Sequence, residues 1–255
     1  LFAADLASET NRGLKPDWIP RIIAPLQQEY DFALATYQQH YFEDVIPSFL
    51  VSPLLEQFYG YKIEGTISGI YAISHDLVED LCLEFKFWSG INRGYGIDPW
   101  IVTRVIVWGK VLCQVKLGSK LEKISWNKIN YVFKEIARAF FECIKRDEDY
   151  WLKRQFVLKV PDQCGERWDD LPVEAEFNPN DMILFFKRHY NRYNKIFQTA
   201  LDTNTFAELQ EIALAPQGEF TFSAGIWTRI VHAFCFEYWF SEDLNPDDIL
   251  IALTS

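Results

Sequence analysis

The sequence predicts an α/β domain followed by a helical C-terminal domain, and two patterns carry this prediction. Up to about residue 120, short apolar segments of strand character alternate with amphipathic segments of helical period. After Gly118 the strand-like segments stop, and apolar residues recur at every third or fourth position. Strand–helix alternation is typical of a layered sheet with some parallel pairing. We therefore expect an α/β part over residues 1–120 and a helical domain over residues 121–255.

Four short segments of strand character are expected to form the sheet. They cover residues 1–6, 31–37, 65–73 and 111–117. Residues 155–180 contain three Pro and several acids, so we expect a connecting loop there. Four strands make a thin sheet, and the first of them starts at residue 1. The chain is therefore expected to be the later part of a larger α/β domain, whose earlier strands precede residue 1.

The predicted helices of the α/β part begin and end at recognisable residues. Pro16 opens the first helix and Ser74 caps the second. Asp98 and Pro99 are suited to the cap and the first turn of the third helix, which Gly109 terminates. Apolar periodicity predicts three further helices, over residues 129–144, 182–200 and 226–240.

Composition excludes some classes of protein. The net charge of −11 argues against a nucleic-acid-binding protein, which needs a basic surface to displace counterions from phosphates. The five cysteines form no CxxC pair, so we expect no zinc knuckle or redox motif, and we expect a reducing, cytoplasmic compartment. No run of 18 apolar residues predicts a membrane span. Aromatic residues make up 16% of the chain, which predicts a thick core or an aromatic-lined pocket.

Three carboxylates fall near expected strand ends, where open α/β sheets bind their ligands. Asp5 ends the first strand, Asp98 follows Tyr95-Gly96-Ile97 at a loop–helix junction, and Glu122 comes five residues after the last strand. Such oxygen donors suit Mg²⁺ or Mn²⁺. The alternative is that Asp98 is only a helix cap and that the other two are solvated loop acids.

Two further features are open to two readings. His40 follows a strand and can overhang a pocket, although a lone His is more often a hydrogen-bonded structural residue. The segment Gly65-Thr66-Ile67-Ser68-Gly69 exposes backbone that lets a ligand approach closely, but it fits a strand bulge equally well.

Six segments, in order, carry a resemblance to a known family. They are Ala3-Ala4-Asp5-Leu6, Pro16-Asp17-Trp18-Ile19, Tyr30-Asp31-Phe32 with Gln39-His40-Tyr41, Thr66-Ile67-Ser68-Gly69-Ile70, Gly96-Ile97-Asp98, and Leu117-Gly118-Ser119-Lys120-Leu121-Glu122. Together they resemble the retaining GT-A glycosyltransferases of the glucosyl-3-phosphoglycerate synthase and mannosylglycerate synthase kind. The stretch Ile226-Trp227-Thr228-Arg229-Ile230-Val231 is similar to the helical C-terminal domain of the bacterial members.

This resemblance implies a fold and an activity. The fold is the later half of a GT-A (Rossmann-like) mixed sheet domain, followed by an α-helical C-terminal domain. The activity is metal-dependent transfer of a sugar from a nucleotide-sugar donor to a small hydroxyl acceptor. The implied metal ligands for Mg²⁺ or Mn²⁺ are Asp5 and Glu122, and the implied catalytic groups are Asp98 and the backbone of Ile67. The implied substrate-binding residues are Gln39, His40, Thr66, Ser68, Gly69 and Tyr95. The aromatic-rich helical tail makes a homodimer plausible.

Four positions depart from the family pattern. Ala3 stands where the family has Asp, Gln39 where it has Arg, Ile70 where it has Glu, and Glu122 where it has His. The loss of the Arg predicts an acceptor less anionic than phosphoglycerate, either glycerate-like or a neutral polyol or sugar. Ala3 and Ile70 favour an alternative function, a catalytically degenerate member that acts as a binding or scaffold module.

Overall fold

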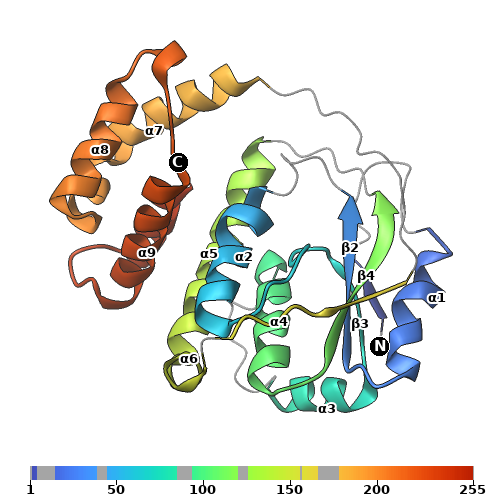
Figure 1. The fold of residues 1–255 in the computed structure, drawn as a ribbon. Coiled ribbons are helices and arrows are strands. Elements are labelled where there is room, and N and C mark those ends of the chain that lie inside the picture. The colour runs from blue at the N-terminus through green and yellow to red at the C-terminus, as the bar shows by residue number, and fades with distance from the viewer. Residues whose placement is uncertain are drawn as a thin grey trace. The chain divides into compact units, whose positions relative to one another are not determined.

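The structure, a computed structural model, describes residues 2–4, 15–38, 45–84, 94–119, 126–155, 157–165 and 178–254. The chain divides into two compact units, Leu1–Ala175 and Glu176–Ser255 (Figure 1). This division falls later than the boundary expected at residue 120. Helix α5 (Trp126–Arg146) is the reason, because it packs against helix α4 (Ile97–Val107) and so belongs to the unit that contains the sheet.

Among the described residues, five strands form one mixed sheet in the order β1-β3-β2-β4-β5. The strands are β1 (Phe2–Ala4), β2 (Phe32–Gln38), β3 (Ile70–Ile73), β4 (Leu112–Ser119) and β5 (Asp162–Cys164). β3 is antiparallel to both of its neighbours, whereas β2, β4 and β5 are parallel to one another. The predicted α/β class with some parallel pairing is therefore confirmed.

The register brings three strand ends to one edge of the sheet. Ala4, the last residue of β1, pairs with Ile70, the first residue of β3. Leu34 of β2 pairs with Tyr71 of β3, so β2 also runs toward the start of β3. Because β1, β2 and β4 point the same way, their carboxyl ends lie at the edge where β3 begins. Residues 65–69, which lead into β3, belong to this same edge.

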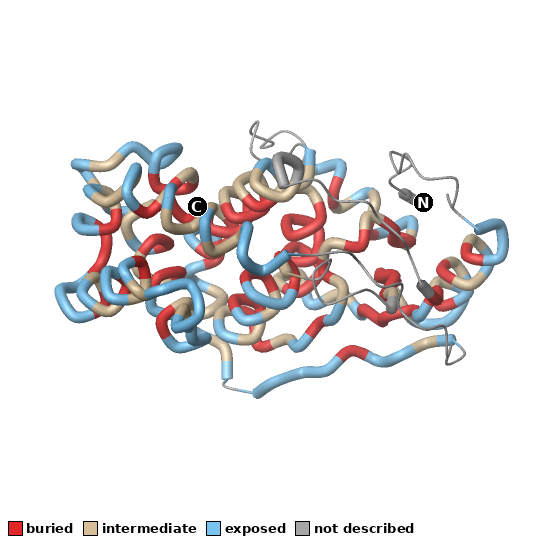
Figure 2. Tube along the Cα trace, turned by 90° about the horizontal axis from the view of Figure 1, so that it is seen from above, coloured by how far each residue is buried: buried red, intermediate tan, exposed pale blue. Residues whose placement is uncertain are grey.

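Two predicted segments differ from what the sequence suggested. Of the strand expected over residues 65–73, only Ile70–Ile73 is a strand, because Gly65 and Gly69 have φ of +60° and +65°, which turn the chain. Within the loop expected over residues 155–180, β5 pairs with β4 as an edge strand. The described residues 157–165 of this stretch are mostly exposed (Figure 2), and their three-residue strand has no apolar alternation to reveal it.

Helices cover both faces of the sheet. In unit Leu1–Ala175 they are α1 (Trp18–Ile23), η1 (Ala24–Gln27), η2 (Pro47–Val51), α2 (Ser52–Leu54), η3 (Leu55–Tyr59), α3 (His75–Glu84), η6 (Gly94–Gly96), α4, α5 and α6 (Glu148–Lys153). Helix α1 lies on one face, α4 lies on the other, and α5 lies beyond α4 (Figure 1).

The core beneath α1 follows from strand alternation. Trp18 and Ile22 of α1 pack in one cluster with Ala33 and Ala35 of β2 and with small or branched residues of β3 and β4. The alanines leave room for the indole ring of Trp18. Since side chains alternate along a strand, Phe32 of β2 points to the opposite face, where its ring lies 5.6 Å from that of Tyr71.

Most positions of helix α4 are apolar, and residues 98–106 are buried throughout. A helix of this composition is expected between two layers rather than on a surface, which is where α4 lies. Its cap position is occupied by Gly96, so the reading of Asp98 as the N-cap is corrected: Asp98 is the second residue of the helix. The helix ends at Val107 with Trp108 as its C-cap, and Gly109 with φ of +67° follows, as the predicted terminating glycine.

Unit Glu176–Ser255 is helical, as the sequence predicts. Its helices are α7 (Pro179–Ala200), α8 (Thr203–Leu214), η7 (Gln217–Glu219), α9 (Ala224–Phe240) and α10 (Pro246–Leu253). The four α-helices each begin with a side-chain cap, supplied by Asn178, Asp202, Ser223 and Asn245 in turn. No helix in the described part of the chain is long and apolar enough to cross a membrane.

Candidate functional site

The candidate site is the edge of the sheet where β1, β2 and β4 end. Asp5 follows β1 in the sequence, Gln39 and His40 follow β2, and Glu122 comes three residues after β4. These four predicted site residues lie outside the described residues. The described part of the edge consists of the turn at residues 65–69 and the beginning of α4.

The turn at residues 65–69 lies close against β2. A Cβ atom placed on Gly65 would lie 3.3 Å from the carbonyl oxygen of Ala35 and 3.5 Å from the Cα of Thr36. Together with the positive φ of Gly65, this close approach requires glycine. Ser68 is buried, and its hydroxyl donates to the carbonyl oxygen of Ile70 (2.9 Å) and accepts from the Ile70 amide (3.3 Å). The Ser68 side chain thus stabilises the turn itself.

Asp98 is held against this turn. The amide of Gly69 donates a hydrogen bond of 3.1 Å to Asp98 Oδ2, which joins the start of β3 to the first turn of α4. The Asp98 residue is only 8% exposed. A carboxylate in the first turn of a helix is stabilised by the positive end of the helix dipole. Burial, together with the nearby Asp98 carboxylate, raises the pKa of Tyr71. The structure therefore brings Gly69 and Asp98 together, as a shared site requires.

Two threonine hydroxyls at this edge are buried without a hydrogen-bond partner among the described residues. Thr36 of β2 is 5% exposed and Thr66 of the turn is fully buried, and neither Oγ1 atom has a partner there. Ile67, between Thr66 and Ser68, is half-buried. The substrate-binding role predicted for Thr66, Ser68 and Gly69 stays a prediction, and the Ser68 hydroxyl is engaged with the backbone of Ile70.

Tyr95 is anchored to α5 instead of to the turn. Its amide donates to Oε2 of Glu135 (3.1 Å), and its ring meets the ring of Tyr131 edge-on at 6.3 Å. The Tyr131 hydroxyl also donates to Glu135, and this hydrogen bond raises the pKa of Tyr131. Glu135 was not predicted from the sequence. In the sequence, Glu135 could be recognised only as an acidic residue on the half-buried side of the amphipathic helix α5.

The position that departs most from the family pattern lies in the core. Ile70 is 2% exposed and packs in the cluster with Trp18 and Ala72, on the face covered by α1. Asp98 and Tyr71 lie on the opposite side of the sheet. The side chain at position 70 is therefore directed away from Asp98 in this fold.

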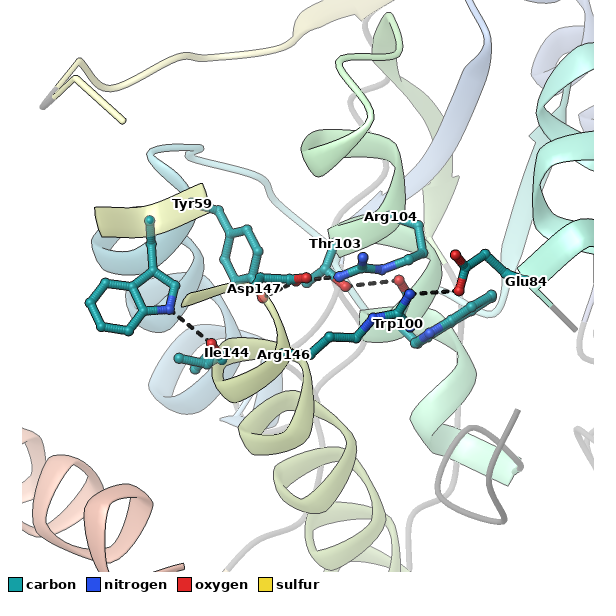
Figure 3. A network of polar contacts seen from close by, with 9 residues as sticks. Tyr59, Glu84, Trp100, Thr103, Arg104, Ile144, Arg146 and Asp147 are labelled. Atoms are coloured by element: carbon teal, nitrogen blue, oxygen red, sulfur yellow. Dashed lines mark hydrogen bonds and ion pairs between the residues drawn. The ribbon is translucent and has the colours of Figure 1, made fainter. Parts of the chain in front are cut away.

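A buried polar network on the far side of α4 was also missed by sequence reasoning (Figure 3). Arg104 of α4 forms an ion pair with Asp147, which follows α5, and the Tyr59 hydroxyl donates to the same Asp147 oxygen (2.8 Å). Burial favours a neutral Arg104, but the Asp147 carboxylate raises the pKa of Arg104 overall. Burial also raises the pKa of Tyr59. The signal was present in the sequence, since Arg104 is the one cation in a helix whose other residues, apart from Asp98 and Thr103, are apolar.

In the described part of the chain, no three His, Cys, Asp or Glu side chains lie close enough together to hold a metal ion. The predicted metal ligands Asp5 and Glu122 fall outside that part. A scan against protein-family models finds no match to this chain, and a search of curated proteins finds none.

Proposed function

We propose that this chain is part of a retaining glycosyltransferase, which moves a sugar from a nucleotide-sugar donor to a hydroxyl group of a small acceptor. One observation carries the proposal: Asp98 is held by the Gly69 amide at the edge where β1, β2 and β4 all end. Ligands of open α/β sheets bind at such an edge. The mixed sheet is also what the resemblance of the sequence implies.

Asp98 is the proposed base. Its carboxylate would orient the acceptor hydroxyl and take its proton as the hydroxyl attacks the sugar. The Gly69 hydrogen bond fixes the carboxylate beside the turn, so little reorientation is needed during reaction. The backbone of Ile67, in the middle of the turn, would lie under the anomeric carbon and stabilise its developing positive charge.

A divalent cation would be held by Asp5 and Glu122, whose oxygen atoms suit Mg²⁺ or Mn²⁺. When bound, it neutralises the diphosphate of the donor. β1 and β4 are three strand spacings apart, roughly 14 Å. Three residues extend by at most about 10 Å, so both carboxylates reach one ion only if residues 120–122 return along the edge toward β1. Variants at both positions test this requirement.

The acceptor pocket would be formed by Gln39 and His40 after β2 and by Tyr95 before α4. Gln39 brings no positive charge to this pocket, which favours a glycerate-like or neutral polyol acceptor over a phosphorylated one. Thr66, Ser68 and Gly69 supply the adjoining backbone. Equal turnover of phosphoglycerate and glycerate by the complete protein would contradict this preference.

The test begins with binding and ends with turnover. The melting temperature of the complete protein is measured with a panel of nucleotide sugars, with and without Mn²⁺, because a ligand of the folded state raises it. We expect one donor to raise it only with Mn²⁺, and Asp5→Ala or Glu122→Ala to abolish that shift. With this donor, Asp98→Asn is expected to lower the transfer rate at least about 100-fold while the shift remains.

Asp181→Asn is the matched control, because Asp181 also lies in the first turn of a helix but belongs to the other unit. It should leave the transfer rate unchanged. An Asp98→Asn variant as active as the parent protein would remove Asp98 from the mechanism. Absence of any donor-dependent shift or transfer would overturn the proposed activity as a whole.

A second candidate function is a degenerate transferase fold that binds a protein partner. The core position of Ile70 favours it, because the family carboxylate has been replaced by a packing residue there. The two candidates differ in the panel experiment, since a binding module would respond to no nucleotide sugar. Copurification of a stoichiometric protein partner, lost on substitution of the exposed aromatic Phe240, would support the second candidate.

A further inference from the structure

Lys116 stands out on the face of the sheet that carries Asp98. It lies on β4 between Val115 and Leu117, which are both buried in the core beneath α1. Strand alternation therefore directs the Lys116 side chain to the opposite face, together with Gln114. Lys116 is exposed, and its ammonium group makes no ion pair among the described residues. A cation without a counterion is thus placed on this face.

Thr36 lies beside Lys116. The two residues are partners in the parallel β2–β4 register, so their side chains share one face. The β2–β3 pairing ends at Leu34 and Tyr71, and Gly69 immediately precedes β3, so the same register continued by two residues would bring Gly69 opposite Thr36. Gly69, Thr36 and Lys116 then form a row across three strands, roughly 10 Å long, with Asp98 bonded to the Gly69 end.

Two hydroxyl groups near this row, those of Thr36 and Thr66, have no hydrogen-bond partner among the described residues. Thr36 Oγ1 has no partner among the described residues, and Gly65 packs directly against the Thr36 backbone. Thr66 follows Gly65, and its buried hydroxyl also has no partner there. A buried hydroxyl without a partner destabilises the folded state, so such groups are normally satisfied by a ligand or by water.

Gln114 positions the segment that carries Thr66. Its side-chain amide donates to the carbonyl oxygen of Glu64 (2.7 Å) and its oxygen accepts from Gln163 of β5 (3.1 Å). The Gln114 side chain is therefore engaged within the protein and fixes Glu64 over β4. The groups that remain for a ligand are one ammonium and two hydroxyls.

We propose that Lys116, Thr36 and Thr66 form a binding site for a small oxyanion, a carboxylate or a phosphate. The Lys116 ammonium supplies the charge and the two hydroxyls donate hydrogen bonds, a combination that suits an oxygen-rich anion. The anion site does not depend on sugar transfer, and its test needs no nucleotide sugar.

The test measures the melting temperature of the complete protein with inorganic phosphate, glycerate and glycerol, at ionic strength held constant with NaCl. We expect phosphate or glycerate, but not glycerol, to raise it in a saturable way. Lys116→Gln should lower the affinity for that anion about tenfold, because the charge is lost. Lys116→Arg, which keeps the charge, should retain most of the affinity. Lys195→Gln, at an exposed lysine of the other unit, is the control for the change in net charge.

The role of the hydroxyl groups is tested by the direction in which a substitution changes the melting temperature, without and with the anion. Thr36→Val removes an unsatisfied group, so we expect it to raise the melting temperature without anion and to reduce the anion-dependent increase. A response to phosphate alone identifies a phosphate-bearing ligand, and a response to glycerate alone identifies a carboxylate ligand; both support the site. No response to either anion, or a response unchanged by Lys116→Gln, overturns it. Either result leaves the donor-binding test of the transferase proposal independent.

Discussion

Arg104 and Asp147 form an ion pair in the interior of unit Leu1–Ala175, and it links the middle of α4 to the end of α5. Their side chains are 2% and 3% exposed. A buried pair of this kind need not stabilise a fold relative to apolar residues, but removal of one partner leaves the other charge unpaired. The pair therefore makes the two helices dependent on one another.

Asp147→Ala is expected to lower the free energy of unfolding by about 3–5 kcal/mol, because Arg104 then stays buried without its carboxylate. Tyr59→Phe should cost only about 1 kcal/mol, since one hydrogen bond is lost and the ring contacts with Phe140 remain. Urea denaturation measures both. Asp149→Ala breaks the exposed pair with Lys153 and should leave stability nearly unchanged. Equal effects of the Asp147 and Asp149 substitutions would contradict the buried pair.

Alanine substitutions at two glycines with similar φ distinguish the cost of backbone strain from the cost of a steric clash. Gly60 and Gly109 have φ of +71° and +67°. Alanine at Gly109 meets no atom within 4 Å, so Gly109→Ala should cost about 1 kcal/mol of backbone strain. At Gly60 the added Cβ would lie 2.9 Å from the carbonyl oxygen of Val157, so Gly60→Ala should cost at least twice as much. Chemical denaturation of the two variants side by side provides the comparison, and equal losses would rule out the conflict at Gly60.

Introducing at position 70 the Glu that the resembled transferases carry should not create activity. Ile70→Glu places a charged group in the core beside Trp18, and we expect it to lower the free energy of unfolding by about 3 kcal/mol. It should bring no gain in transferase rate. Leu83→Glu is the control, because Leu83 is an exposed residue of α3. A stable Ile70→Glu protein with increased transfer would show that position 70 reaches the substrate.

The cap of α8 gives a pH dependence. Hydrogen bonds from the Thr205 hydroxyl and then the Thr205 amide lower the pKa of Asp202 below its ordinary value of 3.8. A lowered pKa stabilises the folded state above pH 3.8, and this stabilisation is lost as the pH falls through the folded-state pKa. Asparagine also caps helices here, as Asn178 and Asn245 show. Asp202→Asn should therefore lower the melting temperature at pH 7 and have a smaller effect below pH 3.8.

Scanning calorimetry from pH 7 down to pH 2.5 measures this difference in melting temperature. A constant difference over the whole range would mean that the charge of Asp202 does not contribute. Thr205→Val, which removes the hydroxyl but keeps the amide, should reproduce part of the effect.

The sequence was informative where one local pattern determines one element. The periodicity of residues 129–144 predicts α5, and Gly109 marks the end of α4. β5 could not be found in this way, because three residues in a polar, proline-containing segment carry no alternation and only the pairing with β4 makes them a strand. Local rules also misplaced Asp98, whose side chain accepts from Gly69, a residue 29 positions earlier.

The candidate site was predictable in outline only. The strand-end rule singled out Asp98, whereas residues 65–69 were expected inside a strand, so the hydrogen bond between Gly69 and Asp98 was not predicted by it. The row formed by Gly69, Thr36 and Lys116 needs the strand order β3-β2-β4, which no local pattern determines. The contributions predicted for Asp5, Gln39, His40 and Glu122 stay predictions.

The ion pair of Arg104 also limits how the sheet edge can move. Arg104 lies six residues after Asp98, about 9 Å along the same helix. Because the ion pair holds the middle of α4, we expect the helix not to slide along its axis and Asp98 to keep its position. Gly65 and Gly69, which both have positive φ, lie at the two ends of the turn beside Asp98. If the proposed transferase activity is confirmed, an altered acceptor specificity should be sought in the sequence and length of these five turn residues rather than in helix α4.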